Sequence, residues 1–172
     1  DDSTVTVDVA ALIVLGENGI GVADFCDDPD VVIDAVNGVL GPPDADSDWV
    51  EPMSISACAG NEARRVTWGS LDLMFGDESS IDGGRRHFFG FAYGDRDGFD
   101  VTPPGLSTDD GIGVGTTVEF LRAAYPDVQL IEGEPGVQDP TFYVNARLSG
   151  LLTDTTDDGA VTLIIGGDPC GV

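Results

Sequence analysis

The residues that could perform chemistry are mostly aspartates, and one group of them begins like a calcium-binding loop. Asp44, Asp46 and Asp48 place carboxylates on alternate positions, as such a loop does. The pattern then departs, because Trp49 stands where the loop requires glycine and Ile55 where it requires a bidentate glutamate. This segment therefore supplies oxygen ligands without the complete motif.

A second oxygen-rich segment carries Asp95, Asp97 and Asp100. Hard cations prefer such ligands, and extracellular sites bind Ca²⁺ weakly, with dissociation constants of about 10⁻⁴–10⁻³ M. Aspartate also fills turns without binding an ion, because its side chain accepts hydrogen bonds from the nearby backbone. Ca²⁺ is thus the only candidate cofactor, and ordinary acidic turns are the favoured alternative.

The sequence offers little for catalysis. His87 is the only histidine, which excludes a metal site with several histidine ligands and leaves one imidazole as a general base. Its neighbours, Arg85-Arg86 and Phe88-Phe89, predict a surface position at a strand end. Neither Ser70 nor Ser107 stands in the complete Gly-x-Ser-x-Gly context of a nucleophile elbow. We therefore expect a protein that is not an enzyme.

The charge of the chain excludes several classes of partner. It carries 32 acidic residues against 7 basic ones, all arginines, for a net charge of −25. Such a chain repels nucleic acid and anionic membranes, and no apolar run approaches the roughly 20 residues of a membrane span. The charge suits a folded protein in a salty setting, where ions screen its self-repulsion, or simply a solvated acidic surface.

Three cysteines, Cys26, Cys58 and Cys170, have no metal-type spacing. We predict a Cys58–Cys170 disulfide, with Cys26 left over. The chain begins at Asp1 without an initiator Met or a signal sequence, so we expect a mature form. These features favour a secreted or cell-envelope protein.

A duplicated tetrapeptide organises the chain. Gly-Ile-Gly-Val occurs at Gly19–Val22 and again at Gly111–Val114, each time after an acidic turn. The spacing is too long for a solenoid repeat and favours two related parts. We place the first part at residues 1–102 and the second at residues 103–172.

Each copy precedes a helix and then strands. Asp28-Pro29 begins a helix that Gly41-Pro42-Pro43 ends, and a capping box at Thr116 and Glu119 begins a helix that Pro126 ends. Alternating patterns and apolar runs predict strands at residues 4–9, 12–15, 64–68, 71–75, 86–93, 128–131, 141–148 and 160–165. The predicted class is α+β, with two related helix-then-antiparallel-strand halves and the helices on one face of the sheet.

This arrangement resembles the repeated unit of the β-lactamase inhibitor proteins and of the OmlA/SmpA-type outer-membrane lipoproteins. The likeness rests on Leu40-Gly41-Pro42-Pro43 and Ala124-Tyr125-Pro126, each of which closes a helix before strands, and on the tandem arrangement. Known members bind partners outside the cytoplasm without catalysis, some through the uncovered face of the sheet. The resemblance therefore implies an exported binding protein and assigns no inhibitory contact to this chain.

The helix-free face of the sheet is the predicted binding surface. Strand alternation gives it a mixture of side chains that is typical of interfaces: Arg65, Thr67, Met74, Tyr143, Asn145 and Arg147. Alternatively, Arg65 and Arg147 only neutralise nearby carboxylates on a solvated sheet. The same alternation assigns Leu163 and Ile165 to the core and Ile164 to the opposite side.

We predict a non-catalytic binding protein that contacts a protein partner through this face. The alternative is an extracellular structural or adhesive protein that cations, above all Ca²⁺, stabilise. The sequence identifies neither the partner nor the oligomeric state.

Overall fold

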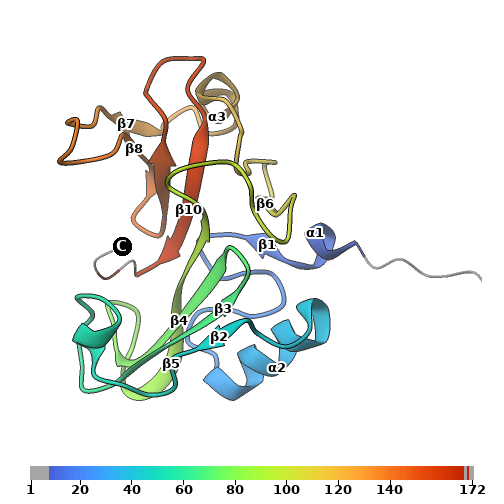
Figure 1. The fold of residues 1–172 in the computed structure, drawn as a ribbon, viewed down its shortest axis with the longest axis vertical. Helices are drawn as coiled ribbons and strands as arrows, with labels where there is room; N and C mark the ends of the chain where they lie inside the picture. Colours follow the sequence, from blue (N-terminus) through green and yellow to red (C-terminus); the bar gives the residue numbers. More distant parts are fainter. Residues whose placement is uncertain (1–7, 169, 171–172) are drawn as a thin grey trace, which may run out of the picture.

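The structure, a computed structural model, describes residues 8–168 and 170. Its largest element is a sheet of eight strands. They are β2 (Ala45–Asp46), β3 (Ala63–Trp68), β4 (Leu71–Glu78), β5 (Gly83–Gly94), β7 (Gln129–Ile131), β8 (Thr141–Asn145), β9 (Leu148–Leu152) and β10 (Val161–Gly167). Across the sheet they follow the order β2-β3-β4-β5-β10-β9-β8-β7, and all neighbours pair antiparallel (Figure 1).

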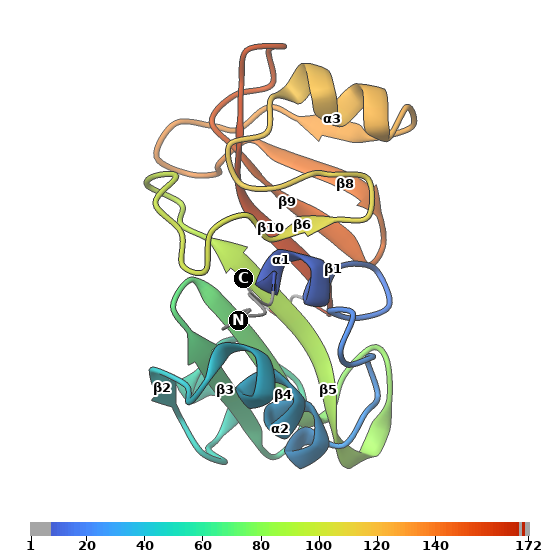
Figure 2. The ribbon, with the colours of Figure 1, turned by 90° about the vertical axis from the view of Figure 1, so that its right-hand side faces the viewer.

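The other elements of the described chain have at most 7 residues, except the 12-residue helix α2. They are α1 (Val9–Leu12), β1 (Val14–Leu15), α2 (Pro29–Leu40), the 3₁₀ turn η1 (Pro52–Ser54), β6 (Ser107–Thr108) and α3 (Val118–Ala124). Figure 2 shows β5 crossing the middle of the molecule, with α2 below it and α3 above. Of the strand predicted at residues 4–9, residues 4–7 lie outside the described part, and Val9 begins α1.

The predicted helix starts are nearly correct. The Asp28 carboxylate accepts a hydrogen bond from the Asp30 N–H at 3.0 Å, and Pro29 occupies the first turn of α2. In α3 the cap lies one residue later than predicted, because Thr117 accepts the hydrogen bond from the Phe120 N–H, at 3.2 Å. Local capping chemistry therefore positions both helices.

The predicted fold class is wrong. We expected an α+β protein of two helix-then-antiparallel-strand halves with helices on one face of the sheet, and the structure is mostly β. α1 has 4 residues and α3 has 7, so they are too short to form a helical layer. Strands from before residue 102 and from after residue 103 join in one sheet through the pairing of β5 with β10. The division into residues 1–102 and 103–172 stays a prediction.

The two copies of Gly-Ile-Gly-Val lie beside a second, two-stranded sheet, in which β1 and β6 pair in parallel. The Ile20 carbonyl oxygen accepts a hydrogen bond from the Val14 N–H at 2.9 Å, and the Ile112 carbonyl oxygen accepts one from the Thr108 N–H at 2.9 Å. Both isoleucine side chains are buried in the main core. The duplicated tetrapeptide therefore makes the same structural contact twice.

Glycine permits the pairing of β5 with β10. Gly166 lies opposite Phe91, and a Cβ atom at Gly166 would stand 2.2 Å from the Phe91 ring. Gly94 has a φ of +135°, and a Cβ atom there would stand 2.1 Å from the Thr162 carbonyl oxygen. A side chain at either position would therefore push the two strands apart.

Two β-bulges reverse predicted faces of the sheet. In β10 the register shifts between Val161 and Leu163, so Ile164 enters the main core and Leu163 and Ile165 do not. We predicted the opposite assignment. In β8 the register shifts between Tyr143 and Asn145. An extra residue in one strand turns the following side chains to the other face, and alternation along the sequence does not record it.

The predicted disulfide between Cys58 and Cys170 is present, with its Cα atoms 4.7 Å apart, and Cys26 is a free thiol. The bridge joins segments 112 residues apart in the sequence. It belongs to a small buried cluster that is separate from the main core: Cys58, Met74 and Phe89, with Ile55, Ile81 and Cys170 packed against them. The end of β10 is thereby fastened to the segment that precedes β3.

We expect replacement of both Cys58 and Cys170 by serine to lower the free energy of unfolding by about 2–5 kcal/mol, because the bridge restricts the unfolded chain over a long loop. Urea unfolding followed by circular dichroism measures the change. The matched control, Cys26→Ser, should alter the free energy of unfolding by less than about 1 kcal/mol. Equal effects of the two replacements would contradict the prediction.

Candidate binding face of the sheet

One ladder of directly paired residues crosses all eight strands. In order from β2 to β7 it consists of Ala45, Thr67, Asp72, Ala92, Ile165, Ser149, Tyr143 and Gln129. Paired residues of an antiparallel sheet point to the same side, and none of these eight belongs to the main core. We call this side the outer face.

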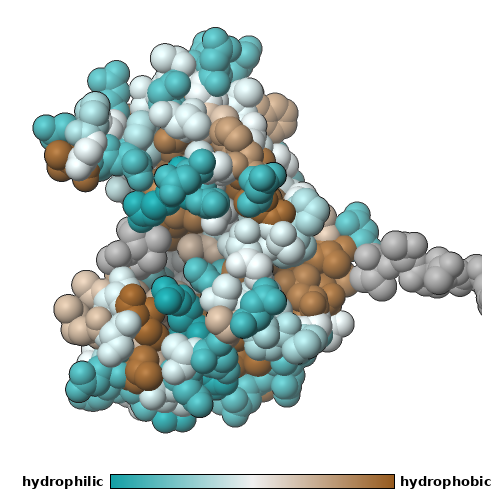
Figure 3. Space-filling model, in the orientation of Figure 1, coloured by the Kyte–Doolittle hydropathy of each residue, from teal (hydrophilic) through white to brown (hydrophobic). Residues whose placement is uncertain are grey.

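Side chains of the outer face are buried at the middle of the sheet and exposed on its two edge strands. Ala45 and Gln129, on the two edge strands, are exposed, whereas Ile165 at the centre is buried. On the side opposite α1, the part that contains β7 and β8 and the part that contains β2 to β5 project outward as two separate masses (Figure 3).

A groove of about 520 Å³ lies on the outer face toward the β7 end. Its floor is formed by β8, β9 and β10, through Tyr143, Ser149, Leu151 and Ile165, and the loop at residues 136–139 forms one wall. Arg96 reaches this wall and pairs with Asp139, with 3.3 Å between Nη1 and Oδ2. The sequence prediction found only Tyr143 of this group, because loop residues carry no alternation.

The rim of this groove is partly apolar, beside the polar residues Arg96, Gln138 and Asp139. Val137 is 77% exposed and Tyr143 is 40% exposed, and Ile131 on the edge strand β7 is also exposed. Ile131 pairs with Thr141, which lines the groove, so it lies on the same side of the sheet. Three exposed apolar side chains thus gather around one depression on a chain that is otherwise strongly acidic.

Of the three binding residues predicted in the first part, two lie accessible on the outer face and one is buried. Thr67 lies in the ladder and donates a hydrogen bond to the Asp72 carboxylate at 2.5 Å. Arg65 is exposed on the same side, where it pairs with Met74 in the next strand. Met74 is only 5% exposed and packs in the disulfide cluster, so it cannot contact a partner without rearrangement.

The three binding residues predicted in the second part, Tyr143, Asn145 and Arg147, lie in three different places. The ladder places Tyr143 about 24 Å from Thr67, since five strand spacings separate them. Asn145 follows the bulge and turns to the other side, where it hydrogen-bonds to Glu17. Arg147 lines a separate pocket with Glu17 and Phe25. The six predicted residues therefore do not form one patch.

Asn145 belongs to another pocket, of about 460 Å³, lined by Gly19 and Gly21 of the first tetrapeptide and by Asp109 and Asp110, which precede the second. Its acidic members come from both parts of the chain: Glu17, Asp24, Asp109 and Asp110. Burial, the largest influence, and the nearby carboxylates of Asp109 and Asp110 raise the pKa of Tyr125, whose hydroxyl donates to Thr108 at 2.9 Å. This pocket is acidic and has no arginine in its lining.

The carboxylates of the first acidic segment are engaged by the protein itself. Arg64 holds Asp46 with two hydrogen bonds, 2.9 Å to Oδ1 and 2.6 Å to Oδ2, and these bonds keep the pKa of Asp46 below its usual range. Asp44 accepts a hydrogen bond from the Gly69 N–H at 2.5 Å. Asp48 donates its own N–H to Asp46 at 2.9 Å. The segment is a hydrogen-bonded turn.

The second acidic segment is also a turn, because the Asp95 carboxylate accepts the Asp97 N–H at 3.0 Å. Asp100 is exposed. Within residues 8–168 and 170, no three aspartate, glutamate, histidine or cysteine side chains converge as metal ligands would. Calcium binding at either segment stays a prediction.

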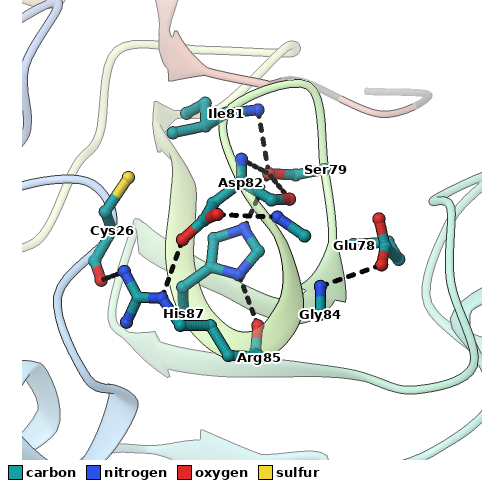
Figure 4. A network of polar contacts seen from close by, with 9 residues as sticks. Cys26, Glu78, Ser79, Ile81, Asp82, Gly84, Arg85 and His87 are labelled. Carbon is teal, nitrogen blue, oxygen red and sulfur yellow. Dashed lines mark hydrogen bonds and ion pairs between the residues drawn. The ribbon is translucent and has the colours of Figure 1, made fainter.

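The prediction for His87 is wrong, since the side chain is 0% exposed and not on the surface. It lies under the hairpin that joins β4 to β5, where Ser79 and the Arg85 carbonyl oxygen contact its two ring nitrogens, each at 2.7 Å (Figure 4). A buried imidazole with both nitrogens engaged is inaccessible to a substrate. Its position supports a structural role.

No known protein family, curated protein or solved structure matches the chain. In the part of the chain that the structure describes, no helix is both long enough and apolar enough to cross a membrane.

We expect Asp46→Asn to lower the free energy of unfolding by about 0.5–1 kcal/mol at pH 7, the range of a well-aligned, partly exposed ion pair. Because the pKa of Asp46 is lowered in the folded state, its contribution is present above the unfolded pKa of about 4 and is lost as the pH falls through the folded pKa. Urea unfolding at pH 7 and pH 3 should show the difference shrinking at acid pH. Exposed Asp97→Asn is the control, and an equal loss there would refute the assignment.

We expect NaCl and CaCl₂ at matched ionic strength to raise the melting temperature equally. Screening of the net charge of −25 needs no specific site, and Asp44 and Asp46 already bind the protein's own donors. Thermal unfolding in each salt and with a chelator measures this. A rise specific to Ca²⁺ that Asp46→Asn and Asp48→Asn abolish would establish the calcium alternative instead.

Proposed function

We propose that the protein is a non-catalytic binding protein, secreted or in the cell envelope, that contacts a basic protein partner through the outer face of the sheet. The groove with its partly apolar rim carries this proposal, because exposed apolar groups gathered around one depression are characteristic of binding sites. The disulfide is compatible with an oxidising compartment.

Tyr143 is the expected anchor of the interface. It lines the groove, is 40% exposed and belongs to the ladder of the outer face. Tyrosine is enriched among residues that dominate binding energy, because its rigid ring offers apolar area and its hydroxyl a hydrogen bond. The open groove beside it has room for an apolar side chain from the partner.

The net charge of the chain supports a basic partner. Within the described residues, Arg64, Arg85, Arg86, Arg96 and Arg122 each pair with a carboxylate, which leaves a large excess of acidic groups at the surface of a chain of net charge −25. Such a field accelerates association with cationic partners and opposes anionic ones. The expected partner therefore presents an apolar side chain within a basic surface.

Site-specific photo-cross-linking tests the proposal. With a benzophenone amino acid at position 143, the protein should give one dominant adduct with a basic protein in the extracytoplasmic fraction of its native cells. The same group at position 120 is the matched control, because Phe120 is 51% exposed on α3, away from the outer face. Equal adducts at both positions, or none at position 143, would overturn the proposal.

Binding of the purified partner supplies the quantitative test. Tyr143→Ala should weaken it by about tenfold or more, the loss typical of an anchor residue, whereas Phe120→Ala should leave the dissociation constant unchanged. Circular dichroism checks that both variants fold. An unchanged affinity for Tyr143→Ala would refute the role of the groove even if the partner binds.

A further inference from the structure

His87 lies in a hydrogen-bond network whose donors and acceptors match only when its ring is neutral. Its Nδ1 faces the Arg85 carbonyl oxygen at 2.7 Å, and a carbonyl oxygen can only accept, so Nδ1 carries the proton. Its Nε2 faces the Ser79 Oγ, also at 2.7 Å. Figure 4 shows the ring enclosed by the hairpin between β4 and β5.

Ser79 decides the state of the second nitrogen. Its Oγ accepts hydrogen bonds from the Ile81 N–H at 3.1 Å and the Asp82 N–H at 3.3 Å. A hydroxyl oxygen has two lone pairs and one proton, so these two donors occupy the lone pairs. The Ser79 proton is then free to be donated to Nε2 of His87, which completes the network.

We propose that protonation of His87 opens the turn at residues 79–82, which makes this hairpin a pH-sensitive element of the fold. A protonated ring brings a third donor to the Ser79 Oγ, which has only two lone pairs. One of the two backbone hydrogen bonds at Ile81 or Asp82 must then break. The Ser79 hydroxyl would turn toward the Asp82 carbonyl oxygen, 3.5 Å away.

The opening would reach the outer face of the sheet, because the turn holds two other segments in place. The Ser80 N–H donates to Asp168, at the end of β10, at 2.8 Å. The Ile81 side chain packs against the cluster that contains the Cys58–Cys170 disulfide. Loosening of the turn therefore removes support from the β10 end while the disulfide keeps the chain attached.

The other charged groups around the hairpin are carboxylates and arginines. The hydrogen bond from the Gly83 N–H, the largest influence, and the hydrogen bond from Arg85 hold the pKa of Asp82 below its usual range. Arg86 does the same to the pKa of Glu62, and backbone N–H groups of Glu62 and Asn61 to that of Asp77. Glu78 and Asp168 accept backbone N–H groups, from Gly84 and Ser80 respectively. His87 is the only imidazole of the chain, and imidazole is the side chain whose unperturbed pKa lies between pH 5 and pH 8.

Nuclear magnetic resonance of the full chain tests the proposal without any partner, so the result is independent of the proposed binding function. As the pH falls from 8 to 5, the amide signals of Ile81 and Asp82 should shift with the same midpoint as the His87 ring. Their protection from hydrogen exchange, corrected for the intrinsic rate, should fall by about tenfold, the loss of one local hydrogen bond. The Thr156 N–H, which the Asp154 carboxylate accepts at 2.9 Å, is the internal reference.

Two variants separate the His87 effect from general acid effects. In His87→Gln, the Ile81 and Asp82 signals should no longer titrate in this range. If that variant does not fold, Ser79→Ala serves instead, because it removes the shared acceptor and should expose the two amides at every pH. A His87 ring that stays neutral to pH 5, or one that titrates while both amides keep their shifts and protection, overturns the proposal.

Discussion

The pairing of β5 with β10 is the constraint on which the rest of the structure depends. It joins two groups of four strands that would otherwise each expose an unpaired edge and an apolar side. Five residue pairs make this seam, from Leu163–Gly94 to Gly167–Gly90. With helices as short as those of this chain, neither group could cover its apolar side alone. The seam therefore creates one main core, to which Tyr93 and Ile164 contribute from its two sides.

The form of the outer face follows from the same seam. At its centre three of the outer positions are small: Ala92, which lies opposite the larger Ile165, and the paired glycines Gly90 and Gly167. Toward the β7 end, Tyr143 and the loop at residues 136–139 rise above the sheet and enclose the groove. The seam glycines are needed for close strand contact, since a Cβ atom at Gly90 would stand 2.8 Å from the Asp168 carbonyl oxygen.

Local signals predicted the parts of this fold that depend on local chemistry. The cap at Asp28 and the hairpin of β3 and β4 were expected from neighbouring residues. The Cys58–Cys170 disulfide was also predicted, but no local signal determines a pairing between segments 112 residues apart. The fold class was wrong because the pairing of β5 with β10 joins residues far apart in the sequence. The site was only partly predicted: the bulge after Tyr143 moved Asn145 to the other side, and the disulfide cluster covered Met74. His87 was misplaced because the hairpin that buries it is a tertiary feature.

The shares of the binding affinity that come from the net charge of the chain and from the groove beside Tyr143 would change with the ionic strength. The described arginines in ion pairs fix local structure, as Arg64 does for the turn at Asp46, so they do little to offset the acidic field that a partner meets. In dilute solution that field extends over roughly 10 Å or more and selects basic partners before contact. Near 1 M salt the screening length falls to about 3 Å, and this selection is lost. Affinity must then come from apolar contact in the groove beside Tyr143, which salt does not weaken. A chain this acidic that works in a saline setting would therefore depend on the shape of its outer face more than on its charge.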